Sequence, residues 1–104
     1  MAYYGTNVPF AWCYGTMRSS TSISRSRGLS SLTDEGFGQF RANFSPTVST
    51  SNYAMVGSAS NNNGEAQYLC VRNSGTRSTS ALSMEVYTYA GGRNDCEFGF
   101  ALYI

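Results

Sequence analysis

Large apolar residues recur at every second position in several parts of this chain, and this alternation limits its possible folds most strongly. In residues 38–44, GQFRANF, the side chains of Phe40, Ala42 and Phe44 point one way and the polar ones between them point the other. Successive side chains of a β-strand lie on opposite faces of its sheet, so this period predicts a strand with one buried face. Helical periodicity is hard to find anywhere in the sequence.

The same alternation recurs in residues 81–89, ALSMEVYTY. Leu82, Met84 and Val86 are expected to face a core, while Ser83 and Glu85 are expected on a wet face. A polar face on every second residue is typical of antiparallel sheets with one solvated side. The segment therefore predicts a second amphipathic strand.

The final segment, EFGFALYI, has no charged residue on either face after its first position. One face is expected to carry Phe98, Phe100, Leu102 and Ile104, and the other Gly99, Ala101 and Tyr103. A strand that is apolar on both sides is expected at the centre of a sheet or against a partner subunit.

Further strands are expected over residues 11–14, 53–59 and 67–72. Residues 22–33, SISRSRGLSSLT, predict a long polar strand with a bulge or bend near Gly28, and TDEGFG (33–38) predicts a hairpin turn.

Glycines in residues 61–67, 72–78 and 89–95 are expected to supply the positive φ of tight reversals. Such spacing of turns predicts one antiparallel, jelly-roll-like β-sandwich of about seven or eight strands.

Composition argues against an enzyme. The chain has no histidine and no lysine, which removes histidine dyads, Schiff bases and the lysine of a P-loop. Asp34 with Glu35, and Asp95 with Glu97, are pairs of carboxylates that a glycosidase could use, but we interpret them as turn residues and partners of arginine. We therefore predict no catalytic residue and no cofactor.

The three cysteines, Cys13, Cys70 and Cys96, have no metal-ligand spacing, so we predict no metal site. The sequence favours three buried thiols, and the alternative is one disulfide with a free thiol. The net charge of +1 does not favour nucleic acid as a partner.

No segment is long and apolar enough to insert into a membrane, and MAYYGTNVPF lacks the features of a signal peptide. We expect synthesis in a cytoplasm without export by such a signal.

Only 12% of the residues are charged, about half the usual share. A small protein with so few charges is prone to associate with itself, and permanent assemblies hide such surfaces. The composition therefore favours a homo-oligomer.

Three segments in order resemble a domain of tail-fibre-type proteins of tailed bacteriophages. They are FAWCYGT (10–16), ISRSRGLSSLTDEGFGQFRANF (23–44) and NYAMVGSAS (52–60), so the resemblance covers about residues 10–104. The chain departs from the family pattern at Cys13-Tyr14 and in EGFGQF. The resemblance implies a β-sandwich, commonly a homotrimer, on the exterior of a virion, where it contributes to host attachment after synthesis in the host cytoplasm.

Under this hypothesis residues 1–9 are an N-terminal attachment arm and residues 10–104 a single β-sandwich domain. The alternative is a capsid decoration (cement) protein that clamps neighbouring shell subunits. In either role the partners are copies of the chain and other virion proteins. Candidate attachment or interface residues are Tyr3, Tyr4, Pro9, Phe10, Trp12 and Tyr103.

A host surface glycan or protein is the further partner expected of an attachment protein. Saccharides are bound by aromatic faces together with polar groups, and two loops supply polar groups. The candidates are Asn61, Asn62 and Asn63 in one loop and Arg93, Asn94 and Asp95 in the other. The competing interpretation is that these residues only form turns.

Overall fold

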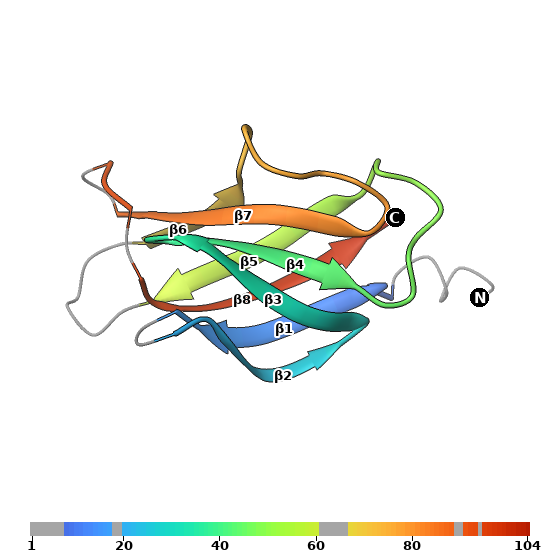
Figure 1. The fold of residues 1–104 in the computed structure, drawn as a ribbon, viewed down its shortest axis with the longest axis horizontal. Coiled ribbons are helices and arrows are strands. Elements are labelled where there is room, and N and C mark those ends of the chain that lie inside the picture. Colours follow the sequence, from blue (N-terminus) through green and yellow to red (C-terminus); the bar gives the residue numbers. More distant parts are fainter. Residues whose placement is uncertain (1–7, 18–19, 61–66, 89–90, 94) are drawn as a thin grey trace.

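The computed structural model describes residues 8–17, 20–60, 67–88, 91–93 and 95–104. Within these ranges the chain forms β-strands and no helix (Figure 1). The strands are β1 (Ala11–Thr16), β2 (Ser22–Arg27), β3 (Leu29–Gly36), β4 (Gln39–Phe44), β5 (Ala54–Ser60), β6 (Gln67–Val71), β7 (Ala81–Thr88) and β8 (Glu97–Tyr103). The prediction of an all-β chain is confirmed.

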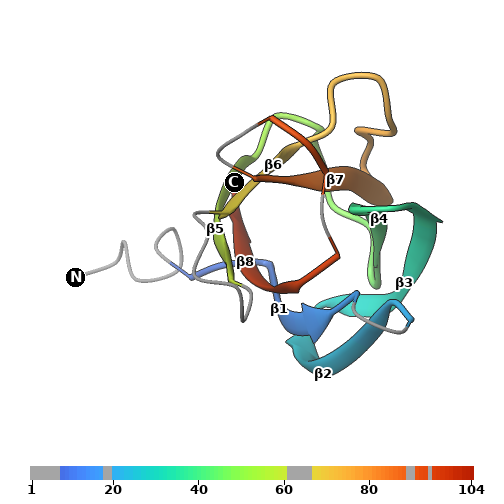
Figure 2. The same cartoon turned by 90° about the vertical axis from the view of Figure 1, so that its left-hand side faces the viewer.

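The strands form two four-stranded antiparallel sheets that pack face to face (Figure 2). Sheet I has the strand order β2-β1-β8-β5, and sheet II has the order β3-β4-β7-β6. The predicted antiparallel β-sandwich is thus confirmed. Strand β8, which has no charged residue after Glu97, lies between β1 and β5. This is the central position expected for a strand that is apolar on both faces.

The chain passes from sheet I to sheet II at Gly28. The sequence predicts one long strand with a bend here, and the structure instead has two strands, β2 and β3, which belong to different sheets. Gly28 has a φ of 80°, and a Cβ at this position would lie 2.3 Å from the carbonyl oxygen of Phe10. Only glycine fits both the left-handed conformation and the close approach of the two backbones.

Alternating side chains of both sheets fill the space between them, as the sequence predicts. Phe40, Leu82 and Met84 of sheet II and Leu102 of sheet I are fully buried. Ile104 is an exception: it was expected on this inner face, but it follows the end of β8 and is 61% exposed. The last residue of the segment lies beyond the sheet that would have buried it.

The hairpin predicted in residues 33–38 is confirmed. Gly36 and Gly38 have φ angles of 140° and 70°, and the turn joins β3 to β4. The backbone N–H of Gly36 donates to Oδ1 of Asp34 (2.9 Å), and the N–H of Gly38 donates to Oδ1 of Asp95 (2.7 Å). The turn is therefore tied to the segment that precedes β8 as well as to its own first residue.

Two residues expected on a wet face are buried instead. Ser83 and Glu85 do point away from the core, but Ser83 is inaccessible and Glu85 is only 8% exposed. The segment that joins β6 to β7 covers Ser83: a Cβ on Gly75 would lie 2.4 Å from the Cβ of Ser83. Gly75 is not among the residues with positive φ, so this close packing, rather than the predicted left-handed turn, accounts for the glycine.

Candidate binding surfaces

The outer face of sheet I carries a group of exposed apolar side chains. Trp12 and Val56 lie on either side of Ala101 in the strand register, and Tyr14 lies opposite Gly99 in the next row. Tyr14 and Val56 are 49% and 64% exposed. Side chains that are paired across neighbouring strands lie on the same face. We call Trp12, Tyr14, Val56, Ala101 and Tyr103 the apolar face.

Two arginines border one side of the apolar face. Arg27 is paired with Trp12 and Arg25 with Tyr14, both on the edge strand β2. Both arginines are exposed. The centre of the sheet, formed by β1 and β8, thus presents aromatic and small side chains next to a positively charged edge.

The structure places two predicted interface residues on this face. Trp12 and Tyr103 are both partly buried and both point away from the core. Phe10 has a different position: its ring packs edge-on against Phe44 and Tyr53, with centroids 5.3 and 5.4 Å apart, and so closes one end of the core. Pro9 is partly buried. Tyr3 and Tyr4 lie outside the described residues.

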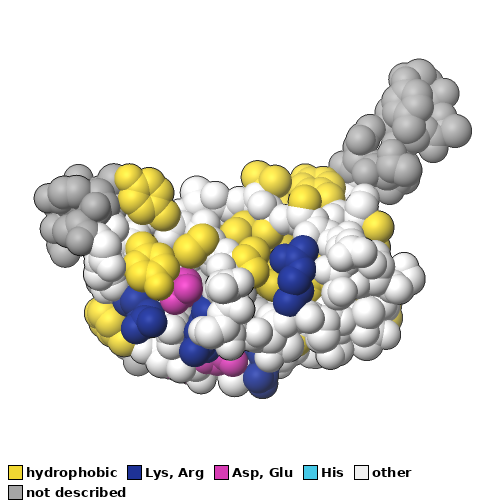
Figure 3. Space-filling view, turned by 90° about the horizontal axis from the view of Figure 1, so that it is seen from above, with side chains coloured by type: hydrophobic (Ala, Val, Ile, Leu, Met, Phe, Trp, Pro, Cys, Tyr) yellow, Lys and Arg dark blue, Asp and Glu magenta, His cyan; other side chains and the backbone are white. Residues whose placement is uncertain are grey.

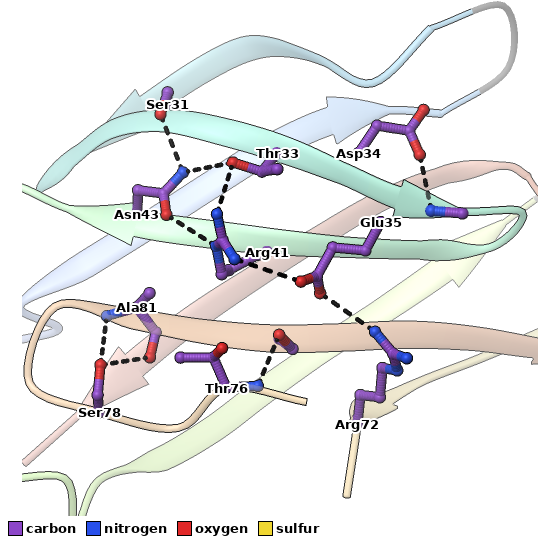
Figure 4. A network of polar contacts seen from close by, with 12 residues as sticks. Ser31, Thr33, Asp34, Glu35, Arg41, Asn43, Arg72, Thr76, Ser78 and Ala81 are labelled. Atoms are coloured by element: carbon purple, nitrogen blue, oxygen red, sulfur yellow. Dashed lines mark hydrogen bonds and ion pairs between the residues drawn. The ribbon is translucent and has the colours of Figure 1, made fainter. Parts of the chain in front are cut away.

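The outer face of sheet II carries charged side chains that contact one another. The carboxylate of Glu35 lies between two guanidinium groups, with Oε2 3.5 Å from Nη1 of Arg41 and Oε1 3.5 Å from Nη1 of Arg72 (Figure 4). The Glu35 side chain is only 16% exposed. The carboxylate therefore links β4 to the segment that follows β6.

A second carboxylate on this face contacts a third arginine. Oε1 of Glu85 lies 3.3 Å from Nε of Arg93, and the Glu85 side chain is 10% exposed. The amide oxygen of Gln39, in the orientation that satisfies both amide atoms, accepts from Nε of Arg93 (3.0 Å) and Nε of Arg72 (3.3 Å). Gln39 thereby joins the two ion-paired groups. We call Glu35, Gln39, Arg41, Arg72, Glu85 and Arg93 the polar face.

Polar side chains extend this network along β3 and β4. Nδ2 of Asn43 donates to the hydroxyls of Ser31 (3.0 Å) and Thr33 (2.9 Å), while its Oδ1 accepts from Nε of Arg41 (3.2 Å) (Figure 4). Each of these residues has its side chain held by at least one neighbour. The polar face is therefore fixed in position before any partner arrives.

Aromatic side chains lie beside the polar face. Tyr68 on β6 is paired with Tyr87 on β7, in the row next to the one that contains Glu85. Tyr68 is 56% exposed. The backbone of Tyr87 forms an isolated antiparallel β-bridge with that of Arg93. Seen from the side of β6 and β7, arginine and acidic side chains lie among exposed hydrophobic ones (Figure 3).

The loop residues predicted to bind a ligand have different positions. Arg93 belongs to the polar face, whereas Asp95 accepts from the N–H of Gly38 and so holds the β3–β4 turn. Asn61, Asn62, Asn63 and Asn94 lie outside the described residues. In the first carboxylate pair weighed as a glycosidase candidate, Asp34 caps its own turn and Glu35 contacts arginines, so these two neighbours have separate contacts.

The cysteines have free thiols. Cys13 and Cys96 are buried as predicted, but Cys70 is only partly buried because it points outward from β6, opposite Glu85. Burial raises the pKa of Cys13 to about 11. Burial, and to a lesser degree the carboxylate of Glu85, raises the pKa of Cys70. Thiols with raised pKa are weak nucleophiles near neutral pH.

The described part of the chain has no pocket and no group of three side chains that could hold a metal ion. None of its segments forms a helix long and apolar enough to span a membrane. The candidate sites are therefore the two outer faces of the sandwich, which are open surfaces.

The sequence predicts the direction of single side chains on these surfaces, but not how the strands bring them together. The alternation predicts that Gln39, Arg41 and Glu85 each point away from the core, and the predicted pairing of Glu35 with arginine is confirmed. The identity of those arginines, Arg41 and Arg72, was not predicted. The strand order of sheet II brings these residues together from positions 37 apart in the chain. Comparisons of this chain with protein-family models, with curated proteins and with solved structures gave no match.

Proposed function

We propose that the chain is a non-enzymatic structural protein on the exterior of a tailed-bacteriophage virion, of the tail-fibre or receptor-binding type, which contributes to host attachment. The resemblance of residues 10–104 to such domains supports the proposal, as does the β-sandwich fold. The main structural support for the proposal is the apolar face, a surface suited to permanent contact with other protein subunits.

The apolar face is proposed to pack against further copies of the chain in a homotrimer. Val56 and Tyr14 expose much of their apolar surface, and the chain as a whole has few charges to keep copies apart. Aromatic residues such as Trp12 and Tyr14 are the side chains that contribute most to protein interfaces. Arg25 and Arg27 would then lie at the polar rim of the interface.

Substitution of the apolar face tests the assembly. Tyr14→Ser with Val56→Ser is expected to convert the trimer into folded monomers, as measured by light scattering after size-exclusion chromatography. The matched control is Tyr68→Ser, which removes a similarly exposed tyrosine from the other sheet and is expected to leave the trimer intact. A wild-type protein that stays monomeric at high concentration would contradict the assembly.

Attachment is tested with the purified wild-type protein and the virion. The protein is expected to coat susceptible cells and to slow adsorption of the phage. A labelled protein that ignores the cells but coats stripped capsids would instead support the decoration role. Imaging of the labelled protein on intact particles distinguishes the tail from the capsid surface.

A further inference from the structure

We propose that the polar face of sheet II, together with Tyr68 and Tyr87, binds a saccharide of the host surface. This inference rests on the proposed role in attachment and names the ligand class and the face that binds it. The binding residues are on strands and on the segments next to them, and only Arg93 was among the loop residues predicted from the sequence.

The aromatic and charged groups lie in adjacent rows of one face. Tyr68 and Tyr87 are directly opposite each other, and Glu85 is two residues from Tyr87 on β7. Residues two apart on a strand are about 7 Å apart on the same face. A sugar ring that stacks on the exposed ring of Tyr68 would therefore extend its hydroxyls towards Glu85 and Arg93.

The polar groups alternate between acceptors and donors. Glu35 and Glu85 are acceptors, and Arg41, Arg72 and Arg93 are donors that lie beside them. A carboxylate offers about four lone-pair positions. The arginine contacts of Glu35, at 3.5 Å, use two of them, and the contact of Glu85, at 3.3 Å, uses one. Sugar hydroxyls both donate and accept, so they match a surface on which the two kinds of group lie side by side.

The same charges disfavour a phosphate-rich ligand. Two carboxylates lie among the three guanidinium groups, so an anion that approached Arg72 or Arg93 would also approach Glu35 or Glu85. The buried Gln39 holds Arg72 and Arg93 in place, so the face loses little side-chain freedom when it binds. A neutral saccharide is the ligand that these features favour.

The test begins with an array of purified bacterial O-antigen and capsular polysaccharides, on which the wild-type trimer is expected to bind at least one polysaccharide. Isothermal titration with an oligosaccharide from that polysaccharide then compares variants on a per-protomer basis. Tyr68→Ala and Arg93→Gln are each expected to weaken binding at least about tenfold, whereas Tyr68→Phe keeps the ring and loses less. Thermal unfolding checks that each variant is folded.

The control is Tyr14→Ala on the apolar face, which is expected to disturb assembly but to leave the per-protomer affinity unchanged. Binding that is equal in wild type, Tyr68→Ala and Arg93→Gln would overturn the inference and leave the attachment role intact. Cell binding without any binding to the array would overturn the saccharide class alone. A protein that binds neither cells nor polysaccharides would contradict the proposed function itself.

Discussion

Phe40 and Phe98 stack across the interior of the sandwich, with ring centroids 4.2 Å apart and ring planes 19° apart. Phe40 comes from sheet II and Phe98 from sheet I, so this contact joins the two sheets directly. Both side chains are at most 1% exposed. The ring of Phe100 lies beside both, with centroids 6.0 and 6.2 Å away, so the three phenylalanines form one cluster of stacked rings in the core.

Phe40→Ala is expected to lower the free energy of unfolding by about 3–5 kcal/mol, because the substitution removes buried surface and leaves a cavity between the sheets. The matched control is Phe37→Ala, three residues earlier, whose ring is 61% exposed. That change is expected to stay within about 0.5 kcal/mol. Urea unfolding followed by circular dichroism measures both, and similar losses for the two variants would contradict the assigned core.

The alternation of apolar residues was enough to predict the inward side chains of β4, β7 and β8, because the period of a strand depends only on its own residues. The division at Gly28 was not predictable in the same way. A bend within one strand and a passage between two sheets look alike locally, and the difference depends on the backbone of Phe10, which is distant in sequence.

The polar face was also only partly predictable from the local sequence pattern. The sequence predicts which residues point outward, but the burial of Ser83 and Glu85 depends on the segment that covers β7 and on Arg93. Long-range contacts of this kind cannot be derived from alternation. The apolar face was partly predicted, because the lack of charge at Gly99, Ala101 and Tyr103 is visible in the sequence. Val56 joins the face only through the register of β5.

Gly28→Ala is expected to destabilise the fold more than Gly91→Ala. Both glycines have positive φ, at 80° and 92°, which costs a residue with a Cβ about 1–2 kcal/mol. At Gly91 a Cβ would meet nothing within 4 Å, but at Gly28 it would clash with the backbone of Phe10 and Ala11. Crowding of this kind adds about 1–3 kcal/mol. Equal losses in chemical unfolding would show that Phe10 does not pass close to Gly28.

Ser83→Ala is expected to lower the free energy of unfolding by about 1–3 kcal/mol, because it leaves the partly buried N–H of Thr76 without its acceptor. The Oγ of Ser83 accepts from the backbone N–H of Thr76 at 2.9 Å, and the serine is inaccessible to water. Ser58→Ala, at an exposed position of β5, is the control and is expected to change stability by less than about 0.5 kcal/mol. Hydrogen exchange should be faster at Thr76 in the Ser83 variant; unchanged exchange there would argue against this contact.

Stability is expected to fall as the pH rises from about 9 to about 11, because of Cys13. Burial raises the pKa of its thiol from 9.0 to about 11, so the folded protein keeps a proton that the unfolded chain releases. As the pH rises, the equilibrium shifts towards the state that binds fewer protons, which is the unfolded chain. The stability that the protonated Cys13 contributes is therefore fully present below pH 9 and is lost between pH 9 and pH 11. The loss amounts to at most about 2.7 kcal/mol.

Denaturant unfolding of wild type and Cys13→Ala at intervals between pH 8 and pH 11 measures this effect, with the comparison made on the pH dependence rather than on absolute stability. The variant is expected to lose less stability across this range. Some dependence should remain, because burial also raises the pKa of Tyr53, against the opposing effect of the Arg77 guanidinium. Tyr53→Phe in the Cys13→Ala background should reduce the remainder. If wild type and Cys13→Ala lose the same stability, the thiol is not buried as the structure has it.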